Sequence, residues 1–251
     1  FSCVINISNR SAAVTCGSGF PDYQGYNLIG NPFASCLDWD YLIHNYPPAY
    51  VDNAIYFTNN GTIASYVSGL GSDGGTGTIP PMQGFFVKAN SNSTVSLHAS
   101  ARVHYLDQYR YKKKSTGENY KSSDTISFVR LLLESSDEST DLVVRFNQKA
   151  TTGFDRTLDA FEFNKEAGDI NMWTTIGDVA YSINGLPFPL TTMEIPVEIN
   201  VKIPGNYKIS SNELNKLENY SVTLKDLSLH KTIDLKMYES YEFTAPVGLT
   251  K

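Results

Sequence analysis

The side chains best suited to chemistry lie in one short segment, Asp38-Trp39-Asp40-Tyr41. A tryptophan between two carboxylates can stack on a sugar ring while the carboxylates accept hydrogen bonds from the sugar hydroxyls. The same residues also suit a structural role, in which a half-buried Trp39 anchors a short helix and the aspartates cap its N-terminus. We therefore expect Trp39, Asp38, Asp40 and Tyr41 either to bind a ligand or to hold a helix in place.

Tyrosines beside loop-rich sequence offer a second binding chemistry. In the first half of the chain they are Tyr41, Tyr46, Tyr50 and Tyr66. Exposed tyrosines in loops can form a stacking surface for sugars or for a protein partner. Sandwich cores also use tyrosine heavily, so burial is the alternative for each of them.

Recognisable catalytic and metal-binding motifs are missing from the sequence. It has no G-x-S-x-G, no H-E-x-x-H, no C-x-x-C and no glycine-rich phosphate loop opening a helix. Carboxylate pairs occur in any acidic chain, so they do not by themselves indicate a glycosidase. Asp38, Asp40, Asp52 and Asp73 could donate oxygens to Ca²⁺, but they lack the spacing of a calcium loop. We predict a chain that is not an enzyme, with no cofactor and no metal site.

The three cysteines, Cys3, Cys16 and Cys36, all lie near the start of the sequence. An odd number leaves at least one thiol unpaired. A hairpin that turns at 9–11 would bring Cys3 close to Cys16, which would allow one disulfide. Three buried thiols that act as small apolar side chains are the alternative.

Composition and patterning predict an all-β fold. The 251 residues include 18 Gly, 16 Tyr and 13 Phe, which suit pleated surfaces and the turns between them. Alternation between turn clusters predicts first-half strands at 3–8, 12–16, 25–30, 54–58, 63–67, 83–89 and 94–98, and one short helix at 37–44. Gly30-Asn31-Pro32 is expected to be a turn. The glycine-rich block 68–77 is expected to be a surface loop without regular structure.

The second half predicts a hairpin formed by 125–134 and 141–147. Further strands are expected at 160–164, 171–176, 178–183, 193–203, 205–210, 219–225, 230–235 and 240–244. Strands of this spacing indicate a sandwich. We therefore predict a jelly-roll-like, aromatic-rich β-sandwich at 1–106, a linker at 107–123 and an immunoglobulin-like β-sandwich at 124–251.

Charge excludes some classes of partner. The net charge is −6, with net charges of −2, +3 and −7 on residues 1–106, 107–123 and 124–251. So few basic residues outside the linker argue against a nucleic-acid partner. No apolar run approaches the roughly 18 residues of a membrane helix, so we expect no membrane insertion. The chain begins at Phe1 without an initiating Met, which is typical of a mature protein or a fragment.

Several of these segments together resemble a known region of other proteins. NLIGNPFASCLDWD at 27–40, the segment 52–57 and IPPMQGFFVKA at 79–89 are similar to the recurrent C-terminal region of large exported surface proteins of the Bacteroidetes. In those proteins a block similar to 141–160 often follows. The chain departs from the usual pattern in carrying Cys36 within the motif. The resemblance implies secretion, and β-sandwich modules appended to adhesins or carbohydrate-active proteins.

The expected function is therefore that of a non-catalytic module, extracellular or at the cell surface, in adhesion or glycan binding. Its partner would be a glycan or a host or cell-surface protein, contacted by Trp39, Asp38, Asp40 and Tyr41, with 68–78 as a rim. The first alternative is a structural spacer or an assembly or secretion module, which predicts a buried Trp39 and no concave aromatic surface. The second is an unrecognised glycan-active hydrolase, which predicts a deep cleft with a carboxylate or histidine of perturbed pKa.

Overall fold

The computed structural model describes residues 2–7 (backbone only), 24–59, 62–104, 125–163, 168–238 and 240–250. The described residues are mostly strands, and their one α-helix is α2 (Trp39–Asn45). The all-β, sandwich-like fold predicted from the sequence is confirmed. The chain divides into two compact units, unit 1 with residues 1–114 and 156–158, and unit 2 with residues 115–155 and 159–251. The linker predicted at 107–123 lies outside the described residues and stays a prediction.

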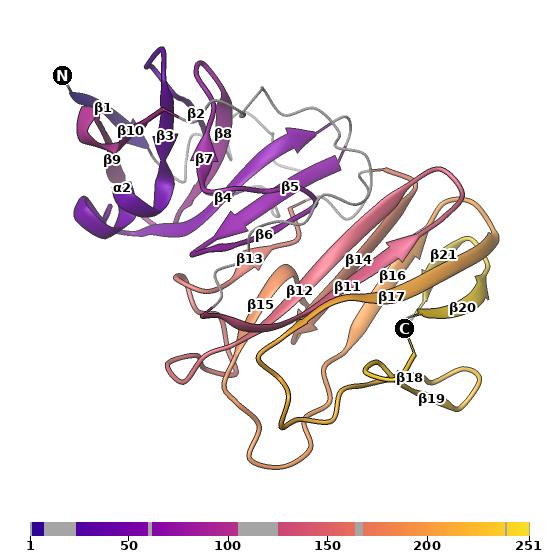
Figure 1. Ribbon diagram of the computed structural model, residues 1–251. Helices are drawn as coiled ribbons and strands as arrows, with labels where there is room; N and C mark the ends of the chain where they lie inside the picture. The colour runs from indigo at the N-terminus through magenta and orange to yellow at the C-terminus, as the bar shows by residue number, and fades with distance from the viewer. Residues whose placement is uncertain are drawn as a thin grey trace. The chain divides into compact units, whose positions relative to one another are not determined.

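Unit 1 is built from antiparallel sheets (Figure 1). Its strands are β1 (Ser2–Ile7), β2 (Tyr26–Gly30), β3 (Cys36–Asp38), β4 (Val51–Asn59), β5 (Thr62–Val67), β6 (Leu70–Ser72), β7 (Thr78–Ile79), β8 (Gly84–Ala89), β9 (Ser93–His98) and β10 (Arg102–Val103), with a 3-10 turn η2 (Ala99–Ala101). The strands with described pairings form three sheets, in the orders β2-β8-β4-β5-β6, β10-β3-β7 and β1-β9.

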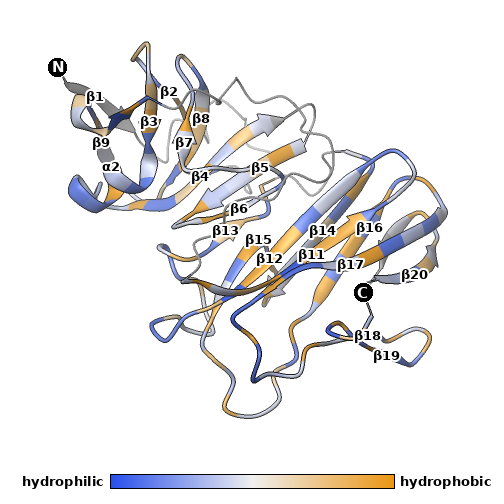
Figure 2. Cartoon of the chain, viewed as in Figure 1, coloured by the Kyte–Doolittle hydropathy of each residue, from blue (hydrophilic) through white to orange (hydrophobic). Residues whose placement is uncertain are grey.

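Strand β8 shows why the alternating pattern predicted these elements. Phe85, Val87 and Ala89 are buried in the core of unit 1, whereas Phe86 and Lys88 on the other face are half-buried. Such alternation of buried and half-buried side chains follows from the two-residue period of a strand. Figure 2 shows hydrophobic and hydrophilic residues mixed along the strands. The predicted strands at 25–30, 54–58, 63–67, 83–89 and 94–98 correspond to β2, β4, β5, β8 and β9. The strand predicted at 12–16 lies outside the described residues.

The expectation for the glycine-rich block 68–77 is wrong. It contains β6, whose three residues are buried and pair with β5. A Cβ atom on Gly71 would lie 1.8 Å from the carbonyl oxygen of Gly75, and a Cβ on Gly75 would lie 1.8 Å from that of Ser65. The glycines are needed here because they let backbone pack directly against backbone. A high glycine content indicates close packing in this block.

We therefore expect Gly75→Ala to destabilise unit 1 by about 3 kcal/mol, because the added methyl group forces two backbone segments apart. Gly30→Ala is the matched control, since a Cβ atom on Gly30 meets nothing within 4 Å. Urea denaturation followed by circular dichroism measures both free energies of unfolding. Equal stabilities of the two variants would contradict the packing role of Gly75.

Unit 2 contains one large sheet and a separate hairpin (Figure 1). Its strands are β11 (Ser127–Glu134), β12 (Ser139–Phe146), β13 (Ala160–Phe161), β14 (Ile170–Ile176), β15 (Val179–Leu186), β16 (Val197–Val201), β17 (Gly205–Asn215), β18 (Thr223–Asp226), β19 (Lys231–Asp234), β20 (Ser240–Ala245) and β21 (Gly248–Thr250). The sheet order is β20-β17-β11-β12-β15-β14-β16-β21, with β13 paired to β15. β18 and β19 form the hairpin.

The hairpin predicted from 125–134 and 141–147 is confirmed, because β11 and β12 pair antiparallel over their whole lengths. The next strand of the sheet, β15, pairs parallel with β12. The strand predicted at 193–203 is shorter than expected and covers only β16. Pro196 and Pro204 flank it, and a proline has no N–H for the sheet hydrogen bonds.

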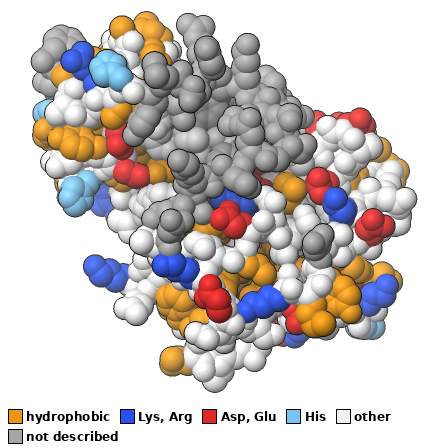
Figure 3. Space-filling model, viewed as in Figure 1, with side chains coloured by type: hydrophobic (Ala, Val, Ile, Leu, Met, Phe, Trp, Pro, Cys, Tyr) orange, Lys and Arg blue, Asp and Glu red, His pale blue; other side chains and the backbone are white. Residues whose placement is uncertain are grey.

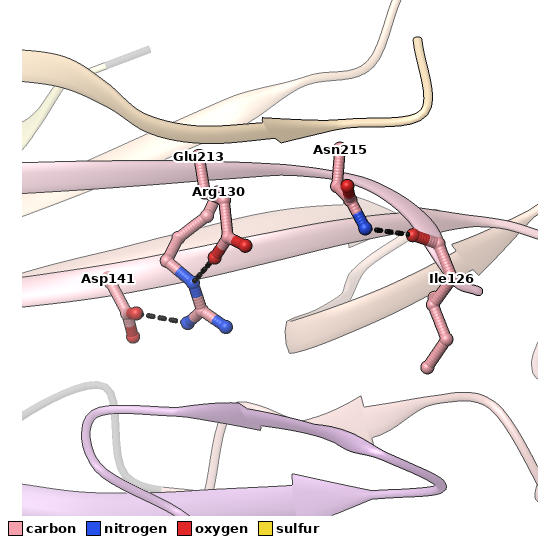
Figure 4. Close-up of polar contacts among 5 residues, drawn as sticks. All are labelled: Ile126, Arg130, Asp141, Glu213 and Asn215. Carbon is pink, nitrogen blue, oxygen red and sulfur yellow. Dashed lines mark hydrogen bonds and ion pairs between the residues drawn. The ribbon is translucent and has the colours of Figure 1, made fainter. Parts of the chain in front are cut away.

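A buried ion network joins three neighbouring strands of this sheet. Arg130 on β11 is 1% exposed, and its Nη1 donates to Oδ2 of Asp141 on β12. Its Nε lies 3.7 Å from Oε2 of Glu213 on β17, so the guanidinium lies between two carboxylates (Figure 4). A register shift between Arg130 and Leu131 makes Glu213 the cross-strand partner of Arg130. Leu131, the next residue, pairs with Ser211, so the bulge lies directly beside the network.

Asp159 is a fully buried carboxyl group of unit 2. Its Oδ1 accepts a hydrogen bond from the Gly185 N–H at 2.5 Å, and its Oδ2 accepts one from the Asp155 N–H at 2.6 Å. Burial raises the pKa of Asp159 to about 7, and the nearby Asp155 charge adds to this, although the two hydrogen bonds and Arg145 oppose it. The folded state therefore favours the protonated acid.

This raised pKa predicts a stability that falls with rising pH. Between the unfolded pKa of about 3.9 and the folded value, the native state binds more protons than the unfolded state. The contribution is therefore fully present below about pH 4 and is lost as the pH rises through about 7. Asp159→Asn removes it and is expected to flatten the slope of unfolding free energy against pH by up to about 1.4 kcal/mol per pH unit. Asp178→Asn, at an exposed turn, is the control in the same urea titrations, and an equal change of slope in the two variants would contradict the prediction.

Candidate ligand-binding site

Trp39 lies in the core of unit 1. Its side chain is 0% exposed, and its Nε1 donates to the backbone oxygen of Asn53 at 2.7 Å. Its ring meets Phe85 edge to face, with centroids 5.7 Å apart. Trp39 is the first residue of α2, and the helix buries it together with Leu42, one turn further on. The prediction that Trp39 stacks on a ligand is wrong, because its ring has no exposed face.

The two carboxylates beside Trp39 are engaged within unit 1. Asp38 is the N-cap of α2, and its Oδ1 accepts the Tyr41 N–H at 2.9 Å. Asp40 accepts a hydrogen bond from the hydroxyl of Tyr66, which is buried. Burial, and then the Asp40 charge, raise the pKa of Tyr66. Tyr41 alone of the expected set is exposed, at 39%, so this segment matches the structural alternative of an anchored and capped helix.

The neighbouring Asn31 also has a structural role. It is 2% exposed, and its Nδ2 donates to the carbonyl oxygens of Ser35, Ile79 and Pro80 at 2.8, 3.1 and 3.0 Å. Its Oδ1 accepts the Phe33 N–H at 3.0 Å. The expected turn at 30–32 is thus held by one amide that reaches a segment 48 residues away. This gives the Asn31 of the Gly-Asn-Pro-Phe motif a structural role.

A shallow pocket of about 420 Å³ lies between the segment that follows α2 and strand β9. Its lining residues are Tyr46, Pro47, Pro48, Ala49, Tyr50, Asn92, Ser93, Thr94, Ser96 and His98. All of them belong to unit 1. None of these residues is Asp, Glu, Lys or Arg. Aromatic rings and prolines therefore meet hydroxyl and amide groups in one concavity, which we call the Tyr50 pocket.

One wall of the Tyr50 pocket is a stacked pair of rings. Tyr46 and His98 lie parallel within 3°, with centroids 3.5 Å apart. The Tyr46 hydroxyl is 3.2 Å from Oγ of Ser100, and its backbone N–H caps α2 by donating to Leu42 at 2.7 Å. Both ends of Tyr46 are therefore positioned by neighbouring elements.

Strand β9 supplies the polar residues of the pocket. Thr94, Ser96 and His98 alternate with Val95 and Leu97, which are buried in the core. The two-residue period of a strand places the three polar side chains on one face, about 7 Å apart from one to the next. The core thus fixes the side of β9 that lines the pocket.

The loop from Pro47 to Tyr50 forms the other wall and is held in place from both sides. Ser93 Oγ donates to the Ala49 carbonyl, and the Asn90 N–H donates to the Tyr50 carbonyl at 2.7 Å. The two prolines restrict the loop further, because each fixes its own φ. Tyr50 has φ +59°, which a bulky residue rarely adopts, and its side chain is 59% exposed.

The Tyr50 pocket has the chemistry of a binding site. Aromatic rings can stack on an apolar face of a ligand, while hydroxyl, amide and imidazole groups exchange hydrogen bonds with its polar edge. Its lining offers no carboxylate pair for acid–base chemistry. Tyr46 and Tyr50 were among the loop tyrosines singled out from the sequence. The residues of β9 were missed, because their only local signal is the alternation of a strand.

The described parts of the chain include a free thiol but no cluster of metal ligands and no membrane-spanning helix. Those residues include no group of three or more His, Cys, Asp or Glu that could hold a metal ion. Asp52 instead accepts from Nδ2 of Asn90 at 2.7 Å. Cys36 is a free, buried thiol whose pKa burial raises, and the expected Cys3–Cys16 pairing lies outside the described side chains. No helix in the described ranges is long and apolar enough to cross a membrane.

The comparisons with known proteins give a family. A family model described as "Domain of unknown function (DUF8693)" matches residues 44–251. No curated protein and no solved structure matches the chain. The match begins within α2, so it includes every residue that lines the Tyr50 pocket.

Proposed function

We propose a function for this chain, which belongs to the DUF8693 family. It is a non-catalytic module of an exported bacterial surface protein, and it binds glycans. The single observation that carries the proposal is the Tyr50 pocket, in which aromatic and hydroxyl-bearing residues face one concavity. Sugars present both apolar ring faces and hydroxyl groups, and this lining can contact both. The resemblance to Bacteroidetes surface proteins supports export and adhesion.

A structural spacer is the second candidate, and specific observations favour it. Trp39 is buried, and Asp38, Asp40 and Asn31 each hydrogen-bond another residue of unit 1. On the visible described surface, acidic and basic side chains are interspersed, and neither sign forms a continuous patch (Figure 3). A spacer does not require the Tyr50 pocket. The two candidates therefore differ in whether altering the pocket abolishes glycan binding.

The experiment is a glycan array and an insoluble-polysaccharide pull-down with the wild-type chain and Tyr50→Ala. Tyr238→Ala is the matched control, because Tyr238 is 58% exposed but belongs to unit 2. Tyr41→Ala tests the segment expected from the sequence. Binding that is lost in folded Tyr50→Ala and kept in Tyr238→Ala supports the proposal.

Two other outcomes would contradict the Tyr50 pocket as the glycan-binding site. Loss in Tyr41→Ala alone would move the site to the start of α2. No binding by the wild-type chain would favour the spacer. Circular dichroism of each variant separates lost binding from lost folding.

A further inference from the structure

We infer that the Tyr50 pocket selects uncharged sugar residues over anionic ones, and that Tyr50 is its pre-organised stacking platform. The inference rests on the proposed function and names the ligand class of the same site. It follows from two independent features of the pocket, which are the charge of its lining and the backbone of Tyr50.

The described residues that line the pocket include no arginine or lysine with which to hold a carboxylate or a sulfate. Among these ten described residues only His98 carries a basic side chain, and its ring is stacked on Tyr46. An anion that enters such a site loses hydration without gaining a charged partner, which is unfavourable. Sites that recognise carboxylates and phosphates use arginine or lysine for this reason. A hydroxyl-bearing neutral ring loses less hydration free energy and can use Asn92, Ser96 and His98 as partners.

The backbone of Tyr50 points to a role in binding. Its φ of +59° is costly for any residue other than glycine. Such strain is often offset by burial of the side chain, yet this side chain is 59% exposed. The hydrogen bonds from Ser93 and Asn90 hold the strained loop in this one conformation. The backbone that carries the ring is therefore fixed at the pocket before a ligand arrives, which lowers the entropy cost of binding.

Matched polysaccharides test the charge selectivity. Affinity electrophoresis with mannan and galactan, against alginate and polygalacturonate, compares neutral sugars with their uronate counterparts. Binding to the neutral member of a pair is expected to be at least about tenfold tighter, and to change little with added salt.

Tyr50→Gly tests the platform. This variant is expected to lose mannan or galactan binding while its melting temperature stays the same or rises, because glycine adopts positive φ without strain. Tyr238→Ala serves again as the control for loss of an exposed ring. A clear fall in melting temperature for Tyr50→Gly would show that the tyrosine stabilises the fold and would overturn its role as a platform.

The outcomes distinguish a failure of the charge selectivity from a failure of glycan binding itself. Equal or tighter binding of alginate or polygalacturonate, lost in Tyr50→Gly, would overturn the selectivity and leave glycan binding in place. Binding of the neutral member alone, lost in Tyr50→Gly and kept in Tyr238→Ala, supports both. No binding of any of the four polysaccharides, with no binding on the array, would overturn glycan binding itself and the selectivity with it.

Discussion

Asn31→Asp is expected to destabilise unit 1 by more than about 4 kcal/mol. The substitution keeps the shape of the side chain but replaces the Nδ2 donor, which now contacts three backbone carbonyls at 2.8 to 3.1 Å, with an acceptor oxygen. Carbonyls left without a donor cost about 1–3 kcal/mol each, and a buried unpaired carboxylate adds several more. Urea denaturation at neutral pH measures the loss.

The same variant has a pH signature. The introduced carboxyl group is expected to be protonated in the folded state, so stability should recover on acidification and fall as the pH rises. Asn147→Asp is the matched control, because the Asn147 side chain accepts the Lys149 N–H through its oxygen, which a carboxylate also can. A loss as small as that of the control would mean that the Asn31 amide does not hold the turn.

Arg130→Met is expected to destabilise unit 2 by about 3–5 kcal/mol. The variant leaves the Asp141 carboxylate, whose side chain is 8% exposed, without the guanidinium that now donates to it. Removing one partner of a buried ion pair costs this much because a buried charge loses its compensation. By contrast, Lys208→Met removes an ion pair with Glu134 whose side chains are 42% and 25% exposed, and it should cost less than about 1 kcal/mol.

The double variant Arg130→Met/Asp141→Leu tests whether the stability lost in Arg130→Met comes from the unpaired charge of Asp141. Replacing a whole buried pair with apolar residues is often close to neutral, so the double variant should regain more than half of the stability lost in Arg130→Met. Denaturation of the single and double variants completes a double-mutant cycle. If the double variant is no more stable than Arg130→Met, the arginine acts through packing and not through its charge.

Much of the architecture of this protein is local, and for that reason the sequence predicts it. Alternation along β8 and β9 depends on residues two positions apart, and the turn residues around them depend on their own φ. The helix expected at 37–44 corresponds to α2. Its N-cap Asp38 accepts a hydrogen bond from a residue only three positions ahead, so the signal for this helix is local. The loop tyrosines Tyr46 and Tyr50 were singled out in the same way.

The identity of the site depended on contacts that no local pattern contains. Tyr66 and Tyr50 were both candidates for an exposed tyrosine surface, yet Tyr66 is 8% exposed and Tyr50 is 59% exposed. The difference arises because Tyr66 pairs across the sheet with β6 and donates to Asp40, 26 residues away. Trp39 is likewise buried by Phe85 and Asn53, which come from other strands.

Sequence alone therefore determined the longer strands, such as β4, β8 and β11, and the helix, because those preferences act between near neighbours. Tertiary structure alone decided which aromatic rings stay exposed, that the glycines of 68–77 pack backbone against backbone, and that β9 meets the loop at Tyr50. The physical reason is that burial and hydrogen-bond partners are set by residues tens of positions apart, such as the 44 positions between Ala49 and Ser93. Only the folded chain brings them into contact.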